Sequence, residues 1–184
     1  MGQKISENKL LDQKRCITLI GMPTSGKSTV GVILAKILGM DFVDTDLIIQ
    51  RKAGKRLANI IAEDGLEGFL SLEEEVCAEL EAENTVIATG GSVVYGEKAM
   101  AHLKDISQVV YLEIDYETLE KRLHHVKQRG VVLRPGQSKK DLYDERSVLY
   151  KKYADVIISE EGLGIEETVQ KIVEAEKLSG LVKK

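Results

Sequence analysis

The sequence predicts an α/β fold in which a parallel sheet is covered by helices on both faces. Short apolar runs alternate along the chain with longer segments whose apolar residues recur at helical spacing. Several of these runs are almost wholly apolar, as expected of strands that are buried on both faces. A glycine-rich turn closes the first run and leads directly into a helical segment. This order of elements implies right-handed crossovers and a parallel sheet.

The expected strands are five short segments. The first reads CITLI at residues 16–20 and ends at Gly21. The others lie at residues 42–43, 85–88, 108–112 and 155–159. Ligands of open parallel sheets bind beyond the carboxyl ends of the strands, so we expect functional residues directly after these runs.

The expected helices fill the intervals between the strands. Apolar residues from Val30 to Leu38 recur at helical spacing, and Gly39 ends that helix. Further helices are expected at residues 46–52, 57–63, 66–83, 96–103, 116–125, 139–153 and 165–178. No linker or internal repeat interrupts residues 16–184. We therefore expect a single domain there, preceded by a flexible N-terminal extension at residues 1–15.

Composition and charge limit the class of protein. The chain has 184 residues, a net charge of −4 and 4% aromatic residues, unlike the basic, aromatic-rich surfaces that bind nucleic acids. No apolar run approaches the roughly 18 residues that span a membrane. We expect neither a nucleic-acid nor a membrane partner, and we expect a monomer. Cys16 and Cys77 are expected to be reduced and buried in a cytoplasmic protein.

The stretch GMPTSGKST at residues 21–29 matches the P-loop pattern. Between a strand and a helix, its backbone N–H groups and the helix N-terminus can converge on phosphate oxygens. Lys27 is expected to reach the β- and γ-phosphates of a nucleoside triphosphate, and the Ser28 hydroxyl to bind Mg²⁺. The expected nucleotide-binding residues of the loop are Gly21, Thr24, Ser25, Gly26, Lys27, Ser28 and Thr29.

Two candidate acceptor-binding features follow the second and third expected strands. In the Asp44-Thr45-Asp46 pair, one carboxylate can hold Mg²⁺ through a water and the other can deprotonate an acceptor hydroxyl. The alternative is that the pair caps a helix. Gly90 and Gly91 either expose backbone N–H groups to a substrate or form a tight turn.

Cations gather further along the chain. Residues 127–140 (KQRGVVLRPGQSKK) carry five of them and are interpreted either as a solvated loop or as a lid over the phosphates. In a lid, Arg134 would supply positive charge to the transition state. Arg146 on the following helix is either an ordinary surface residue or a fork for a substrate carboxylate.

Together these motifs resemble the shikimate kinase family of P-loop kinases. The likeness is carried by GKSTVGVILAKILGMDFVDTD, GLEGFLSLEEEV, VIATGGSVV, Arg134-Pro135 and RSVLYKKYAD. It implies a three-layer P-loop kinase with a five-stranded parallel sheet and a mobile lid at about residues 127–140. It also implies transfer of the γ-phosphate of ATP to a ring hydroxyl of shikimate, with Mg²⁺ as cofactor, in aromatic amino acid biosynthesis.

The resemblance also implies roles for single residues. Asp46 matches the residue that binds the acceptor and is placed to act as base, and Asp44 matches the one that reaches Mg²⁺ through a water. Gly91, next to Gly90, falls where a backbone amide meets the substrate. Arg134 matches the lid arginine that contacts ATP, and Arg146 matches a carboxylate-binding arginine. Lys27, Asp46 and Arg134 form the expected catalytic set.

Three features depart from the family pattern. Leu70 stands where the family usually has the arginine that forms the second half of a carboxylate clamp. Ser92 replaces the third glycine of a Gly-Gly-Gly run, and the shorter lid reads Arg134-Pro135-Gly136-Gln137. Losing one charge-assisted contact costs roughly 1.5 to 3 kcal/mol.

These departures leave the acceptor open. One hypothesis is a shikimate kinase in which Arg146 and another cation hold the carboxylate. Another is a paralogue that phosphorylates a different small hydroxyl compound. A third is an inactive nucleotide-binding regulatory module, which the presence of Lys27, Asp46 and Arg134 opposes.

The helix around Leu70 allows two further interpretations. Leu70 fits an apolar stripe and is then part of the core. The run Glu73-Glu74-Glu75 is expected to be a solvated helix face, with Glu73 alternatively supporting the site from behind.

Overall fold

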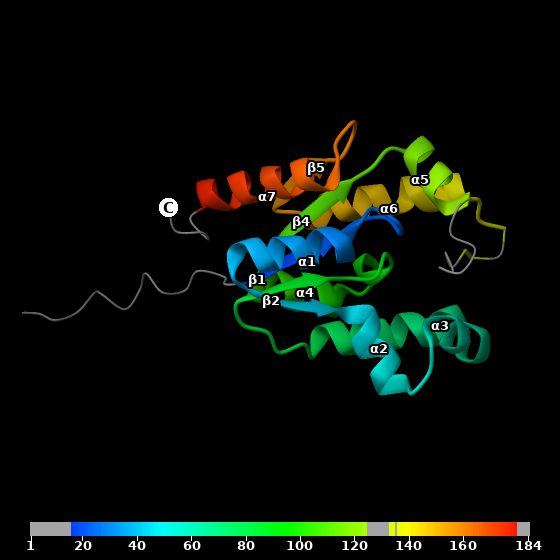
Figure 1. Cartoon of the computed structure of the whole chain (residues 1–184). Coiled ribbons are helices and arrows are strands. Elements are labelled where there is room, and N and C mark those ends of the chain that lie inside the picture. The colour runs from blue at the N-terminus through cyan, green and yellow to red at the C-terminus, as the bar shows by residue number, and fades with distance from the viewer. Residues whose placement is uncertain (1–15, 125–132, 135, 180–184) are drawn as a thin grey trace, which may run out of the picture.

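The structure is a computed structural model that describes residues 16–124, 133–134 and 136–179. Five strands form one parallel sheet in the order β2-β3-β1-β4-β5, with helices on both faces (Figure 1). The strands are β1 Cys16–Ile20, β2 Asp41–Asp44, β3 Thr85–Ala88, β4 Ser107–Glu113 and β5 Val156–Ser159. The predicted α/β fold class is therefore confirmed.

The helices occupy the intervals that the apolar spacing indicated. They are α1 Lys27–Leu38, α2 Thr45–Ala53, α3 Leu57–Ala78, α4 Glu97–Ile106, α5 Tyr116–His124, α6 Lys139–Tyr153 and α7 Ile165–Ser179, with a 3₁₀ turn, η1, at Val93–Tyr95. Of the helices in the described part of the chain, none is sufficiently long and apolar to cross a membrane.

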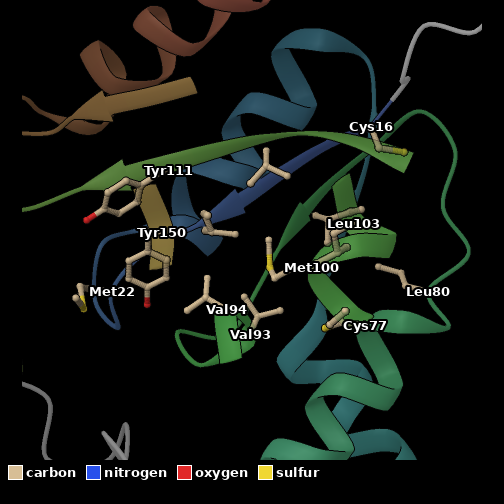
Figure 2. Packing of buried hydrophobic residues seen from close by; sticks show 14 of the residues in the cluster. Cys16, Met22, Cys77, Leu80, Val93, Val94, Met100, Leu103, Tyr111 and Tyr150 are labelled. Atoms are coloured by element: carbon tan, nitrogen blue, oxygen red, sulfur yellow. The ribbon is translucent and has the colours of Figure 1, made fainter. Parts of the chain in front are cut away.

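The alternating side chains of the strands divide the core into two layers. Ile17 and Leu19 of β1 share one cluster with Leu34 of α1 and Ile172 of α7. Cys16 and Ile20 of β1 face the other layer, part of which Figure 2 shows. That cluster contains Cys16, Ile20, Cys77, Met100, Leu103, Tyr111 and Tyr150, so α3, α4 and α6 cover this face.

A third apolar cluster joins α2 to α3. Ile49, Ile60, Phe69 and Val76 are its buried members, and Leu70 packs against it. This small core holds α2 and α3 together beside the end of β2. The interpretation of Leu70 as a core residue agrees with this packing.

Helix α3 differs from the prediction at two points. Residues 57–63 and 66–83 were expected to form two helices, and the backbone does break at Gly65, which has φ 74° and ψ −179°. Only glycine populates this region readily. The second part ends at Ala78 rather than at residue 83. Glu79, Glu81 and Glu83 follow, and acidic side chains are unfavourable at a helix C-terminus.

Parallel strands bring their carboxyl ends to one edge of the sheet. The P-loop follows β1, the Asp44-Thr45-Asp46 pair spans the end of β2, and Gly90-Gly91 follows β3. These three segments, which are far apart in the sequence, therefore meet at the same edge.

Candidate active site

The P-loop connects β1 to α1 and presents the N-terminus of α1 to a large cavity. This cavity has a volume of about 770 Å³. Of the expected nucleotide-binding residues, Thr24, Gly26, Lys27, Ser28 and Thr29 line it. Gly26 is the N-cap of α1, and Thr24 has a positive φ of 67°, which is unusual for a residue other than glycine.

Gly21 and Ser25 do not line the cavity, but both accept hydrogen bonds from Lys27, which does. The Lys27 ammonium donates hydrogen bonds to the carbonyl oxygens of Gly21 and Met22, both at 2.8 Å, and to Ser25 Oγ at 3.4 Å. Burial lowers the pKa of Lys27 to about 8, while the nearby carboxylate of Asp46 opposes this shift. The loop therefore holds one cation at the mouth of the phosphate-binding turn.

The end of β2 places Asp44 against the P-loop. Ser28 Oγ donates a hydrogen bond to Asp44 Oδ2 at 2.7 Å, and the Asp46 N–H donates to Asp44 Oδ1 at 3.0 Å. Asp44 is thus the N-cap of α2, as one interpretation of the pair predicted, and it also contacts Ser28. Asp44 therefore both caps α2 and accepts a hydrogen bond from the P-loop.

The Ser28 hydroxyl and the Asp44 carboxylate are a suitable pair of oxygen donors for Mg²⁺. This ion prefers oxygen ligands and usually retains several waters and substrate phosphates. Within the described ranges, no group of three or more His, Cys, Asp or Glu residues is arranged to hold a metal. A magnesium ion at Ser28 and Asp44 would therefore need further ligands from nucleotide and water.

The turn after β3 forms one wall of the same cavity. Gly90, Gly91, Asp46 and Arg146 all line it together with Lys27. A Cβ atom at Gly90 would lie 2.2 Å from Glu73 Oε1 and 3.0 Å from Asp46 Oδ1. At Gly91 it would lie 2.8 Å from Pro23 Cδ and 3.2 Å from Arg146 Nη1. Close approach of these side chains, rather than a tight turn alone, requires glycine at both positions.

Arg146 reaches the cavity from α6 and is only 3% exposed. Its Nε donates a hydrogen bond to the Tyr95 hydroxyl at 3.3 Å, and its guanidinium carbon lies 5.1 Å from the centre of the Tyr95 ring. Tyr150, one turn further along α6, donates a hydrogen bond to the Gly91 carbonyl at 2.5 Å. Arg146 is therefore a fixed cation beside the glycine turn and not an ordinary surface residue.

Arg134 lies apart from the P-loop in this structure. Its guanidinium forms an ion pair with Glu145 at 3.1 Å and stacks 5.2 Å from the centre of the Tyr95 ring. It lines a smaller cavity of about 350 Å³ together with Leu70 and Ser92. Residues 127–132 and 135 of the expected lid lie outside the described residues.

Glu73 is the main correction to the interpretation of the sequence. The Glu73-Glu74-Glu75 run was expected to be a solvated helix face, with Glu73 alternatively supporting the site from behind. Glu75 is exposed, but Glu73 is 1% exposed, so the alternative agrees with the structure at Glu73. Its Oε2 accepts a hydrogen bond from Ser92 Oγ at 2.5 Å, whereas its Oε1 is buried without a hydrogen-bond partner among the described residues. Burial raises the pKa of Glu73 to about 7, and the charge of Asp46 adds to the rise.

Two of the departures from the family pattern therefore meet at Glu73. Leu70, three residues earlier on α3, supplies no cation, and Ser92 supplies a hydroxyl donor in place of a glycine. The family resemblance already offered a supporting role for Glu73, but its contact with Ser92 leaves no signal in the sequence, because that contact depends on how the turn after β3 lies on α3.

Arg56 is a second residue that the sequence did not single out. It precedes α3 and lines the 770 Å³ cavity together with Asp46 and Arg146. A lone arginine between two helices belongs to no motif, so only its position in the structure draws attention to it.

The fold and the site define a P-loop phosphotransferase that acts on a hydroxyl group. A family model described as shikimate kinase matches residues 23–177. The chain is 41% identical to the shikimate kinase of Thermobifida fusca over 143 residues, covering 77% of this chain and 83% of that protein. It is 37% identical to the shikimate kinase of Paracidovorax citrulli over 171 residues, covering 90% and 93%. The chain belongs to the shikimate kinase family.

Structural similarity leads to the same family. The structure of the shikimate kinase from Acinetobacter baumannii in complex with shikimate matches with a TM-score of 0.82 and 33% identity, covering 95% of this chain and 99% of that one. The shikimate kinase of Aquifex aeolicus matches with a TM-score of 0.78 and 35% identity, covering 90% and 98%. The three-layer P-loop kinase fold predicted from the resemblance is confirmed.

Proposed function

We propose that the protein transfers the γ-phosphate of ATP to a ring hydroxyl of shikimate, giving ADP and 3-phosphoshikimate. The observation that supports this most strongly is that Lys27, Asp46 and Arg146 line one cavity. A phosphate-binding cation, a carboxylate and a carboxylate-binding arginine are thereby available to the two substrates at once.

On this proposal Asp46 binds the acceptor hydroxyl and takes its proton as the oxygen attacks the γ-phosphorus. The bond between the γ-phosphorus and the β–γ bridging oxygen breaks, and its electron pair leaves with ADP. Asp46 suits this role because its backbone is fixed by the cap to Asp44 and its Oδ1 lies over Gly90.

Cations of this chain are proposed to stabilise the negative charge on the phosphate oxygens during transfer of the γ-phosphate. Lys27 is proposed to exchange its loop carbonyl partners for phosphate oxygens, and Arg134 to reach the phosphates when the lid closes. Arg146 holds the carboxylate of the acceptor. Ser28 and, through a water, Asp44 would hold Mg²⁺, which would supply further neutralisation of phosphate charge.

We also propose that the enzyme works as a cytoplasmic monomer. One chain supplies the P-loop, the carboxylates and the glycine turn around a single cavity. Its two cysteines, Cys16 and Cys77, are buried free thiols, as is usual in a reducing compartment.

One observation favours a second candidate, a kinase for a different small hydroxyl compound. Leu70 packs against the apolar cluster between α2 and α3, where the family usually places an arginine of the carboxylate clamp. The acceptor-binding wall therefore differs from the family pattern, while the P-loop does not.

An ATP-consumption assay with a panel of acceptors distinguishes these functions. The panel contains shikimate, small hydroxy acids, polyols and hydroxy amino acids. Turnover of shikimate with the highest kcat/KM supports the first proposal, and preference for another member supports the second. Asp46→Asn is expected to lower kcat by at least a hundred-fold while ATP affinity stays within about two-fold. Undiminished turnover by this variant would exclude Asp46 as the base.

A further inference from the structure

The acceptor-binding wall contains an arginine that the family pattern does not account for. Arg56 lies between α2 and α3, and its exposed side chain lines the 770 Å³ cavity. Of the residues that the structure describes, three cations line this cavity, namely Lys27, Arg56 and Arg146. Because Lys27 belongs to the phosphate-binding loop, Arg56 and Arg146 are the two cations in the described part of the chain that are available to the acceptor.

The location of Arg56 is unfavourable for the helix that it precedes. It is the N-cap of α3, with φ −72° and ψ 151°, and its side chain caps no backbone N–H. Ser, Thr, Asp and Asn are the favoured N-caps, and a cation is disfavoured beside the positive end of the helix dipole. An arginine here costs local stability and so points to a role outside the helix.

The backbone of Arg56 is nevertheless fixed. Its carbonyl oxygen accepts hydrogen bonds from the N–H groups of Asn59 at 2.9 Å and Ile60 at 3.1 Å. Ile60 is completely buried in the cluster between α2 and α3. The backbone at Arg56 is therefore anchored, and its exposed side chain lies at the rim of the cavity.

Two neighbouring cations, Lys55 and Arg51, do not line the cavity as Arg56 does. Lys55 forms an ion pair with Glu63, and Arg51 lies exposed in the last turn of α2. Neither lines the cavity. The contrast singles out Arg56 among the basic residues around the α2–α3 connection.

We propose that Arg56 binds the carboxylate of the acceptor together with Arg146, and so takes over the function of the arginine that Leu70 replaces. This inference rests on the proposed function only in requiring an acceptor with an anionic group. A guanidinium presents two parallel N–H donors that match a carboxylate, so two arginines that line the same cavity can complete a clamp. The acceptor selected by such a pocket is a small hydroxy acid.

The test compares Arg56→Ser with Arg51→Ser in the full chain. Serine is a preferred N-cap, so Arg56→Ser is expected to keep or raise the melting temperature. At the same time it is expected to raise KM for the acceptor about ten- to hundred-fold, with KM for ATP within about two-fold. Arg51→Ser is expected to leave both KM values within about two-fold. Arg56→Lys is expected to give an intermediate KM, because an ammonium group lacks the fork.

Equal acceptor KM values in Arg56→Ser and Arg51→Ser would overturn the proposal. Failure of the proposed function is detected separately, because the acceptor preference of the wild-type protein shows it without any variant. If the wild type prefers another acid in the panel, the same variants are measured with that acid. If it prefers an uncharged acceptor or uses no member, the assignment of Arg56 is overturned as well.

Discussion

The buried Glu73 carboxyl makes stability depend on pH in a way that one substitution tests. Replacing it by glutamine removes the ionisation and keeps the size and a hydrogen-bond partner for Ser92. Burial raises the pKa of Glu73 from an ordinary 4.5 to about 7. A native pKa above the unfolded one means that the native state binds more protons between these values. Stability is therefore expected to fall as pH rises from 4.5 to about 7 and then level off.

The size of this effect follows from the same two pKa values. Each pH unit between them corresponds to about 1.4 kcal/mol, so ionising Glu73 in the native state opposes folding by about 3 kcal/mol above pH 7. Glu73→Gln is expected to be more stable than the wild type by up to about this amount at pH 8. At pH 4.5 the two proteins are expected to differ much less, since Glu73 is then protonated in the native state.

Urea unfolding at pH 5 and pH 8 measures the difference directly. Glu67→Gln is the matched control, because Glu67 is an exposed carboxyl on the same helix. The stability gained by Glu73→Gln is expected to grow with pH, whereas any change in Glu67→Gln is expected to stay constant. If the gain did not depend on pH, or if Glu73→Gln were less stable at pH 8, then Glu73 would not be a buried acid of raised pKa.

Two further predictions concern the acceptor wall. Gly90→Ala is expected to destabilise the fold by about 1 to 3 kcal/mol and to lower kcat, because its Cβ would displace the carboxyls of Glu73 and Asp46. Urea unfolding measures the loss of stability and steady-state kinetics measures kcat. An unchanged kcat would contradict the placement of Asp46. Leu70→Arg is expected to lower KM for shikimate about ten-fold in the wild-type background. In the Arg56→Ser background, where a carboxylate contact is missing, the same substitution is expected to lower KM by a larger factor; no change in either background would favour a different acceptor.

The strands and most helices were predictable because their sequence patterns are local. An apolar run such as CITLI in β1 is explained only by burial on both faces, and the structure shows alternate residues in two separate clusters. The end of α3 was not predictable from periodicity. Leu80 continues the apolar spacing and is buried, yet it lies beyond the helix.

Site residues that belong to local motifs were predictable from the sequence, whereas residues placed by contacts between distant segments were not. The P-loop and the Asp44-Thr45-Asp46 pair carry fixed spacings, so the sequence identified them as candidates, and the structure brings them to one cavity. The placement of Glu73 depends on how α3 lies against the turn after β3, and that of Arg56 depends on the connection between α2 and α3. In the sequence, Glu73 is one of three consecutive acids and Arg56 is one of several exposed cations.

The break at Gly65 separates two tasks within α3. Residues before it, including Leu57 and Asn59, line the 770 Å³ cavity, while the part after it carries Glu73 and Cys77 into the interior. Because the backbone changes direction between them, side chains of the outer segment can be exchanged without moving the inner one. Substitutions in this outer segment can therefore change part of the lining of the cavity while the P-loop and the central sheet stay as they are.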